Sequence, residues 1–69
     1  MKYVIINLDK PDHMLTEISM NNTGWEVAMA PDQEAAIEFD TAEEAVSVID
    51  FIIEVISQKH GEAMDIKAI

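Results

Sequence analysis

An α+β fold is predicted, with a three- to five-stranded, mostly antiparallel sheet and one long helix, about residues 42–60, packed on one face. Two observations predict it: short segments alternate apolar and polar residues, and a single long segment has helical periodicity. The element order is β-β-β-(β)-α-β, in which the bracketed strand is the shortest. Sixty-nine residues suffice for one domain, 1–69, built as two packed layers.

The first strand is predicted over residues 3–8, an almost continuous run of apolar, mostly β-branched residues. Such a run is typical of a strand that is buried on both faces, and hence of a central strand. Val4, Ile6 and Leu8 are expected to share one face, because side chains alternate along a strand.

A β-hairpin is predicted next. Thr16, Ile18 and Met20 alternate with other residues, and a second alternating run begins at Trp25. Between the two runs, residues 21–24 (Asn-Asn-Thr-Gly) are typical of a tight turn, because Asn and Gly tolerate positive φ. We expect Trp25 and the methionines of the strands, including Met20, to lie in the core.

Two more short strands are expected on either side of the helix. The first covers 36–39, with Ile37 and Phe39 pointing inward, and the second covers 63–68. Both follow from alternation over a few residues, which is the pattern of a half-buried strand.

The helix is expected to begin at a capping box and to end near Gly61. Thr41 can accept a hydrogen bond from the amide of Glu44, and the Glu44 side chain can reach back to the Thr41 amide. Acids in the first turn also suit the positive end of the helix dipole. At the other end, Lys59 and His60 lie in the last turn, and Gly61 suits the position after it.

The helix carries more apolar surface than one sheet face needs. Its apolar arc covers roughly 220°, whereas a surface helix needs a stripe a little over 100° wide. The centre of this arc, expected to face the sheet, consists of Ala45, Ile49, Ile52 and Ile56. Either a curved sheet and loops cover both flanks, or one flank forms a two-fold homodimer interface. That interface would consist of Phe51, Val55 and Val48.

Charge is the most unusual property of the composition. Four Lys and fourteen acidic residues give a net charge of −10, and no base occurs between residues 11 and 58. Such a field repels nucleic acid and anionic lipid and attracts basic surfaces, so direct nucleic-acid or membrane binding is not expected. The absence of cysteine excludes disulfides and fits a reducing cytosol, so a cytoplasmic location is expected.

No catalytic constellation is present, and neither enzyme activity nor a cofactor is expected. Two glycines cannot form a Gly-rich phosphate loop, and no Arg is available to clamp an anionic substrate. Asp9, Asp12 and His13 offer ligands for a divalent cation, but the segment includes Lys10 and lacks the spacing of a calcium loop. A solvated turn is the favoured interpretation, and no metal ligand is assigned.

Two interpretations of the acidic surface stay open. It keeps a small domain in solution, or it docks on a basic surface of a partner protein, with carboxylates standing in for phosphates. The second is favoured because the charge exceeds the magnitude of about 2–8 that suits a small domain. The docking surface is assigned to two groups of acids, namely Asp40, Glu43, Asp50 and Glu54, and then Glu26, Asp32 and Glu34.

Residues 36–45, Ala-Ile-Glu-Phe-Asp-Thr-Ala-Glu-Glu-Ala, resemble a strand–cap–helix junction found in many small phage and mobile-element proteins. The size, acidity and lack of cysteine are similar to those of phage-encoded inhibitors of host defence, including anti-CRISPR proteins. The resemblance implies a stoichiometric inhibitor or adaptor that acts as a nucleic-acid mimic in the host cytoplasm, and it assigns no functional residue. The alternative is a homo-oligomeric structural or assembly module that uses the apolar helix flank.

Overall fold

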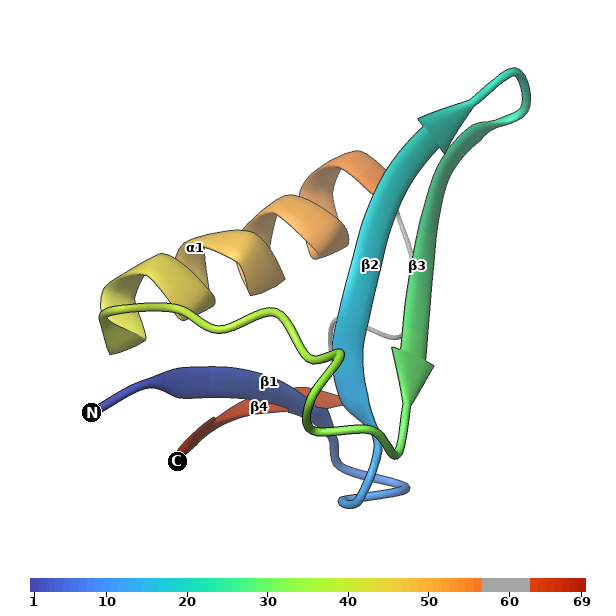
Figure 1. Ribbon diagram of the computed structural model, residues 1–69. Coiled ribbons are helices and arrows are strands. Elements are labelled where there is room, and N and C mark those ends of the chain that lie inside the picture. Colours follow the sequence, from blue (N-terminus) through green and yellow to red (C-terminus); the bar gives the residue numbers. More distant parts are fainter. Residues whose placement is uncertain (57–62) are drawn as a thin grey trace.

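Four antiparallel strands and one helix make up the computed structural model, which describes residues 1–56 and 63–69 (Figure 1). The α+β class and the order of the elements are as predicted. The helix is shorter in the described residues than 42–60, and its expected end at Lys59, His60 and Gly61 lies outside them. The elements are β1 (Tyr3–Asn7), β2 (Met14–Asn21), β3 (Gly24–Ala30), α1 (Ala42–Phe51), a π-helical turn η1 (Ile52–Ile56) and β4 (Met64–Ala68).

The sheet has the order β3-β2-β1-β4, so β1 is central, as its apolar run predicts. It pairs along its whole length with β4, but it pairs with β2 only at Ile6 and Met14. Figure 1 shows the consequence: the β1–β4 pair and the β2–β3 hairpin diverge, and α1 lies in the angle between them.

The predicted strand over 36–39 is wrong, because this segment forms only a single bridge, at Phe39. The Ile37 amide donates to the carbonyl of Leu15 in β2 (2.9 Å), and Phe39 exchanges two hydrogen bonds with Tyr3 in β1 (2.9 and 2.8 Å). The segment therefore bonds to β2 and then to β1 where these strands part. A chain that bonds to a different neighbour every two residues cannot form a ladder with either.

The predicted hairpin and its tight turn are confirmed. Asn21 pairs with Gly24, and the Asn21 side chain accepts a hydrogen bond from the Thr23 amide (2.9 Å). Gly24 has φ +121°, a conformation that L side chains rarely adopt. Glycine at this position therefore closes the turn without strain.

Alternation along β2 is interrupted by a bulge between Leu15 and Glu17. Leu15 and Ile18 consequently both pack in the core, although strict alternation places them on opposite faces. Met20 was expected in the core but is 65% exposed, because the hairpin tip extends beyond the helix (Figure 1). Leu8 was expected to share a face with Val4, but it follows the end of β1 and is exposed.

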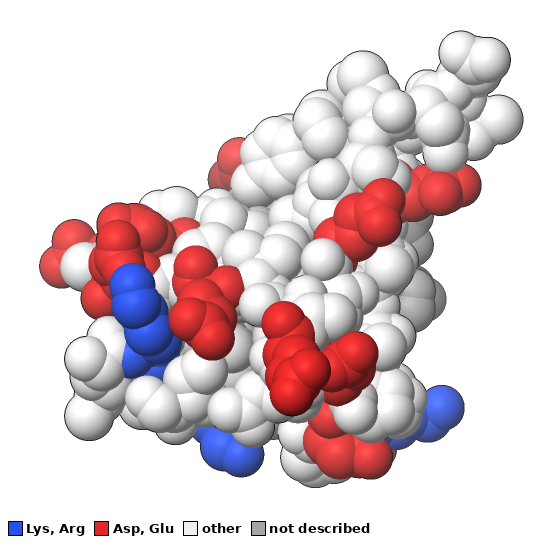
Figure 2. Space-filling model, viewed as in Figure 1, with Lys and Arg blue, Asp and Glu red and all other residues white. Residues whose placement is uncertain are grey.

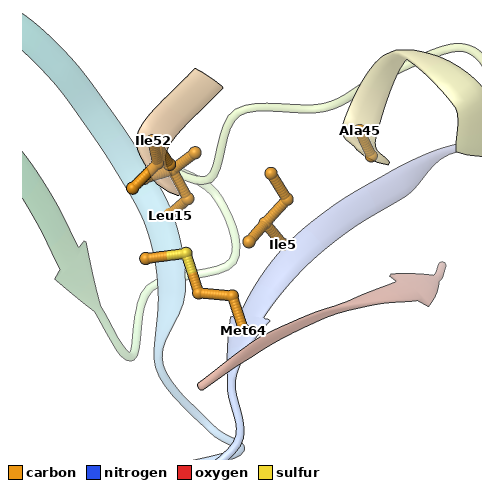
Figure 3. Close-up of a cluster of buried hydrophobic side chains, with 5 residues drawn as sticks. All are labelled: Ile5, Leu15, Ala45, Ile52 and Met64. Carbon is orange, nitrogen blue, oxygen red and sulfur yellow. The ribbon is translucent and has the colours of Figure 1, made fainter. Parts of the chain in front are cut away.

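The core is a cluster of side chains from both layers (Figure 3). Its buried members are Ile5, Leu15, Ala45, Ile52 and Met64. Ala45 and Ile52 are thus on the sheet-facing side of the helix, as predicted, and Ile49 is half-buried against the same cluster. The side chain of Ile56 lies outside the described residues. Val4 is also buried, outside this cluster.

The N-terminus of α1 is capped by Thr41, as the sequence predicts, but the hydrogen bonds of the described residues do not include the predicted return bond from the Glu44 side chain to the Thr41 amide. Thr41 has extended backbone angles, and its hydroxyl accepts a hydrogen bond from the Glu44 amide (3.2 Å). Replacing Thr41 with Ala is expected to lower the free energy of unfolding by about 1 kcal/mol, because one amide of the first turn loses its partner. Urea unfolding measures this loss. Thr41→Ser keeps the acceptor and is the control; an equal loss in both variants contradicts the role of the hydroxyl.

Candidate functional site

The acids that the sequence assigns to a docking surface are all exposed, but they do not form one surface. Glu43, Asp50 and Glu54 lie along the outer side of the helix, since Ala45 and Ile52 occupy the side that faces the sheet. Glu43 and Asp50 are seven residues apart on α1 and share one face, and Glu54 follows them in the π-helical turn η1; these three exposed acids make up the helix stripe.

The loop from residue 31 to residue 41 adds a second row of carboxylates. Figure 2 shows acidic side chains scattered over the face that carries this loop and the start of α1, with one basic side chain among the acids at the left and others at the lower edge. The Asp32 carboxylate accepts hydrogen bonds from the amides of Glu34 (3.1 Å) and Ala35 (3.4 Å), which orders this part of the loop. The exposed acids of the loop are Asp32, Glu34, Glu38 and Asp40.

Glu26 lies on the other side of the molecule. Its neighbours Trp25 and Val27 pack against the core, so alternation along β3 directs Glu26 to the sheet face that the helix does not cover. It pairs with Ser19 there, and Glu17 lies diagonally across on the same face. Glu26 therefore lies on the sheet face opposite the helix, whereas Asp32 and Glu34 lie in the loop that leads from β3 to α1.

Asp40 is partly neutralised by a base that is distant in sequence. Lys2 forms an ion pair with it, and the hydrogen bond and Coulomb attraction of this pair lower the pKa of the Asp40 carboxyl. The same contact raises the pKa of Lys2. The pair is charged at neutral pH; its contribution is lost when pH falls through the lowered pKa of Asp40 or rises through the raised pKa of Lys2.

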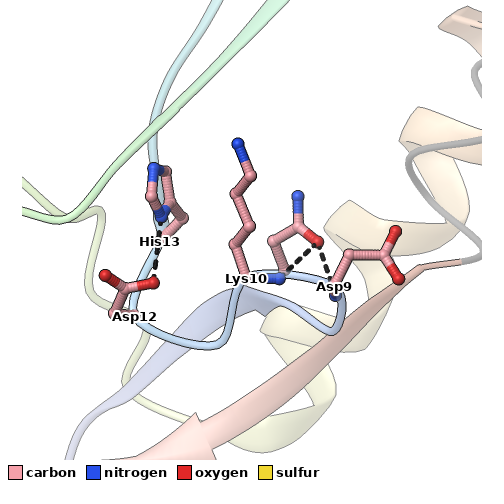
Figure 4. Close-up of polar contacts among 5 residues, drawn as sticks. Asp9, Lys10, Asp12 and His13 are labelled. Atoms are coloured by element: carbon pink, nitrogen blue, oxygen red, sulfur yellow. Dashed lines mark hydrogen bonds and ion pairs between the residues drawn. The ribbon is translucent and has the colours of Figure 1, made fainter.

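The turn over residues 8–13 does not assemble a cation site. Asn7 accepts hydrogen bonds from the amides of Asp9 (2.8 Å) and Lys10 (3.3 Å), and His13 lies 3.1 Å from the Asp12 carboxylate, whose pKa it lowers. Figure 4 shows the Asp9 side chain directed away from Asp12 and His13. No group of three or more potential ligands occurs in residues 1–56 and 63–69.

A half-open cavity of about 350 Å³ lies above this turn. It is lined by four polar residues and three apolar ones, namely Asn7, Asp9, Lys10 and His13, and Val27, Met29 and Met64. Sequence reasoning could not find it, because its lining comes from β1, the following turn, β3 and β4.

One flank of the helix is covered by the hairpin. The Phe51 ring meets Trp25 of β3 edge to face, with ring centroids 5.2 Å apart and planes at 88°. Phe51 and Val48 are half-buried against the core, and Val55 beside them is exposed. The curved sheet thus covers most of the flank on which sequence reasoning placed a homodimer. On the opposite flank, Val46 is 45% exposed and Ile53 is 37% exposed.

No family model matches the chain, and no curated protein or solved structure matches it significantly. Within the part of the chain that the structure describes, no helix has the length and apolar character needed to cross a membrane.

Proposed function

We propose that the chain is a protein-binding module whose acidic surface docks on a basic, nucleic-acid-binding surface of a partner protein. The observation that supports this most is the helix stripe of Glu43, Asp50 and Glu54, together with the exposed acids of the loop that precedes the helix. Among the described residues, the ion pairs are Lys2 with Asp40 and His13 with Asp12, so neither involves the stripe.

The carboxylates of the stripe have a fixed backbone beneath them, which suits a mimic of nucleic acid. The stripe is held by a helix that is packed on the core through Ala45 and Ile52, and Asp32 orders the loop beside it. Charges on a rigid scaffold lose less conformational entropy on binding than charges on a flexible tail. Of the acids predicted from the sequence, the proposed docking surface includes the helix stripe (Glu43, Asp50 and Glu54) with Asp32 and Glu34. Glu26 is excluded from it.

A partner that is occupied in this way cannot bind nucleic acid at the same surface. The module is therefore a stoichiometric inhibitor or adaptor that works in the cytoplasm of a cell. A phage-encoded inhibitor of a host nuclease, such as an anti-CRISPR protein, combines these properties. The alternative function, homo-oligomeric assembly through Phe51, Val55 and Val48, stays a prediction. Less of this helix flank is exposed for an interface, because Trp25 covers Phe51.

The test is capture of partners from cell lysate with the immobilised chain, at low salt and at about 1 M salt, where the Debye length is about 3 Å. We expect a nucleic-acid-binding protein to be retained at low salt, released at high salt and displaced by added DNA. The variant Glu43→Lys, Asp50→Lys, Glu54→Lys is expected to bind it roughly 100-fold more weakly, at about 1 kcal/mol for each reversed contact.

The matched control reverses Asp9, Asp12 and Glu17, which lie outside the proposed surface. Each reversal adds two charges, so both variants change the net charge from −10 to −4. The control is expected to keep most of the affinity. Undiminished binding by the helix variant, or an equal loss in both variants, contradicts the proposed surface.

A further inference from the structure

The outer edge of β4 is not paired with another of the described strands. β4 is the last strand of the sheet and pairs only with β1 among the described strands. Lys2 and Ile69 exchange hydrogen bonds, and the Leu8 amide donates to the Ala63 carbonyl (2.6 Å), so the ladder to β1 uses the odd-numbered residues of β4. In an antiparallel pair such residues alternate with residues whose backbone points away.

The even-numbered residues therefore point their amides and carbonyls outward. These are Met64, Ile66 and Ala68. In agreement with an outward direction, the Ile66 amide donates to the Asp65 carboxylate (2.8 Å); pairing with another strand would exchange this bond for a carbonyl of that strand. An edge with outward amides and carbonyls is a template for another strand.

We propose that β4 pairs antiparallel with β4 of a second copy of this chain, about a two-fold axis through Ile66. This axis matches each residue with the one equally far on the other side of Ile66. Asp65 of each copy then lies opposite Lys67 of the other, and the outward-pointing residues supply the hydrogen bonds. A two-fold interface requires such a self-complementary pattern.

The charge pattern favours this register. Asp65 and Lys67 form the non-hydrogen-bonded pairs, in which Cα atoms are about 4.5 Å apart and the side chains are closest. Opposite charges at such positions attract, and like charges repel. The other sheet edge lacks this pattern: in β3 the single charged residue is Glu26, which no two-fold pairing of that strand places opposite a base.

The helix layer fits the same arrangement. Phe51 faces the β3 side through Trp25, so the opposite flank, with exposed Val46 and Ile53, faces the side of β4. A two-fold axis perpendicular to the sheet places both helices over the same face of one continuous sheet. The flanks of the two helices then approach each other, and the Ile66 side chains of the two copies adjoin.

Net charge opposes association. Lys67 lies opposite Val4 on this edge pair, whereas Lys2, opposite Ile69, is already paired with Asp40. Because two chains of −10 repel at long range, added salt is expected to strengthen this dimer, whereas it weakens docking on a basic partner. The two proposals are independent, and their salt dependences have opposite signs.

Sedimentation velocity of the full chain over a concentration series up to about 1 mM tests the pairing. We expect a dimer of 2 × 7.7 = 15.4 kDa. Asp65→Lys or Lys67→Asp alone places like charges opposite each other, and each is expected to weaken the dimer at least about tenfold. The double variant Asp65→Lys, Lys67→Asp keeps the net charge and restores opposite pairs, so it is expected to dimerise as the unchanged chain does.

Mixing the two single variants provides the sharpest control. A chain with Asp65→Lys and a chain with Lys67→Asp are complementary to each other, so an equimolar mixture is expected to form a heterodimer that neither forms alone. Both side chains are exposed, and circular dichroism checks that the variants fold. The proposal is overturned if the chain is a monomer at every concentration, or if neither the double variant nor the mixture restores the dimer. It is also overturned if Asp65→Lys associates more strongly than the unchanged chain, because Asp65 would then protect the edge from pairing.

Discussion

Replacing Leu15 with Ala is expected to lower the free energy of unfolding by about 2–5 kcal/mol. The Leu15 side chain is fully buried in the cluster with Ile5 and Ile52, and the substitution leaves a cavity between the strands and the helix. A domain of this size is stable by roughly 3–10 kcal/mol in total, so the variant is expected to be largely unfolded at modest urea concentration. Urea unfolding followed by circular dichroism measures the change.

The matched control is Met20→Ala on the same strand. Met20 is mostly exposed at the hairpin tip, so its truncation is expected to change the free energy of unfolding by no more than about 0.5 kcal/mol. Similar losses at both positions would mean that the bulge does not place Leu15 in the core.

Replacing Trp25 with Ala is expected to lower the free energy of unfolding by about 3 kcal/mol. The indole is half-buried, so the expected loss lies at the lower end of the range for truncating a large aromatic residue. It also packs the hairpin against the helix through its contact with Phe51. A double-mutant cycle of Trp25→Ala and Phe51→Ala is expected to give a coupling energy of about 0.5–1.5 kcal/mol for the edge-to-face pair.

A second cycle, Trp25→Ala with Val46→Ala, controls for effects on the helix as a whole. Val46 lies on the opposite flank, so its coupling to Trp25 is expected to be near zero. Equal coupling in both cycles contradicts a specific contact between the rings. Fluorescence of the single tryptophan in Phe51→Ala provides an independent reading, since the indole loses one of its covering rings.

Local patterns predicted the elements that depend on nearby residues. The hairpin turn at Asn21 and Gly24 and the N-cap at Thr41 are set by residues at most three positions apart, and β1 is marked by its own apolar run. The bulge in β2 was missed, because one extra residue in a ladder leaves the composition of the strand unchanged.

Features that depend on contacts distant in sequence could not be predicted. Residues 36–39 have the alternation of a strand, but they form only a single bridge because β1 diverges from β2. How much of the Phe51 side chain is buried depends on how far the hairpin curves over the helix. Such curvature is a property of the whole sheet, and no short pattern encodes it.

For the candidate site, exposure of the acids was predictable from their charge, but their grouping was not. Glu26 is separated from Glu43 because β3 and α1 present opposite sides of a two-layer fold. Lys2 reaches Asp40 from the far end of the sequence, so a stretch without bases in sequence is not free of them in space. The acidic surface is therefore narrower than the sequence suggests.

The two ends of the described chain are neighbours, since Lys2 and Ile69 exchange backbone hydrogen bonds. An affinity tag or a fluorophore attached at either end therefore stands beside the other end, at the opposite end of the molecule from the hairpin tip (Figure 1). A short linker can join residues 69 and 1, and new ends opened between Asn22 and Thr23 leave every strand pair intact. Such a circularly permuted chain would carry its tags away from both the helix acids and the edge of β4.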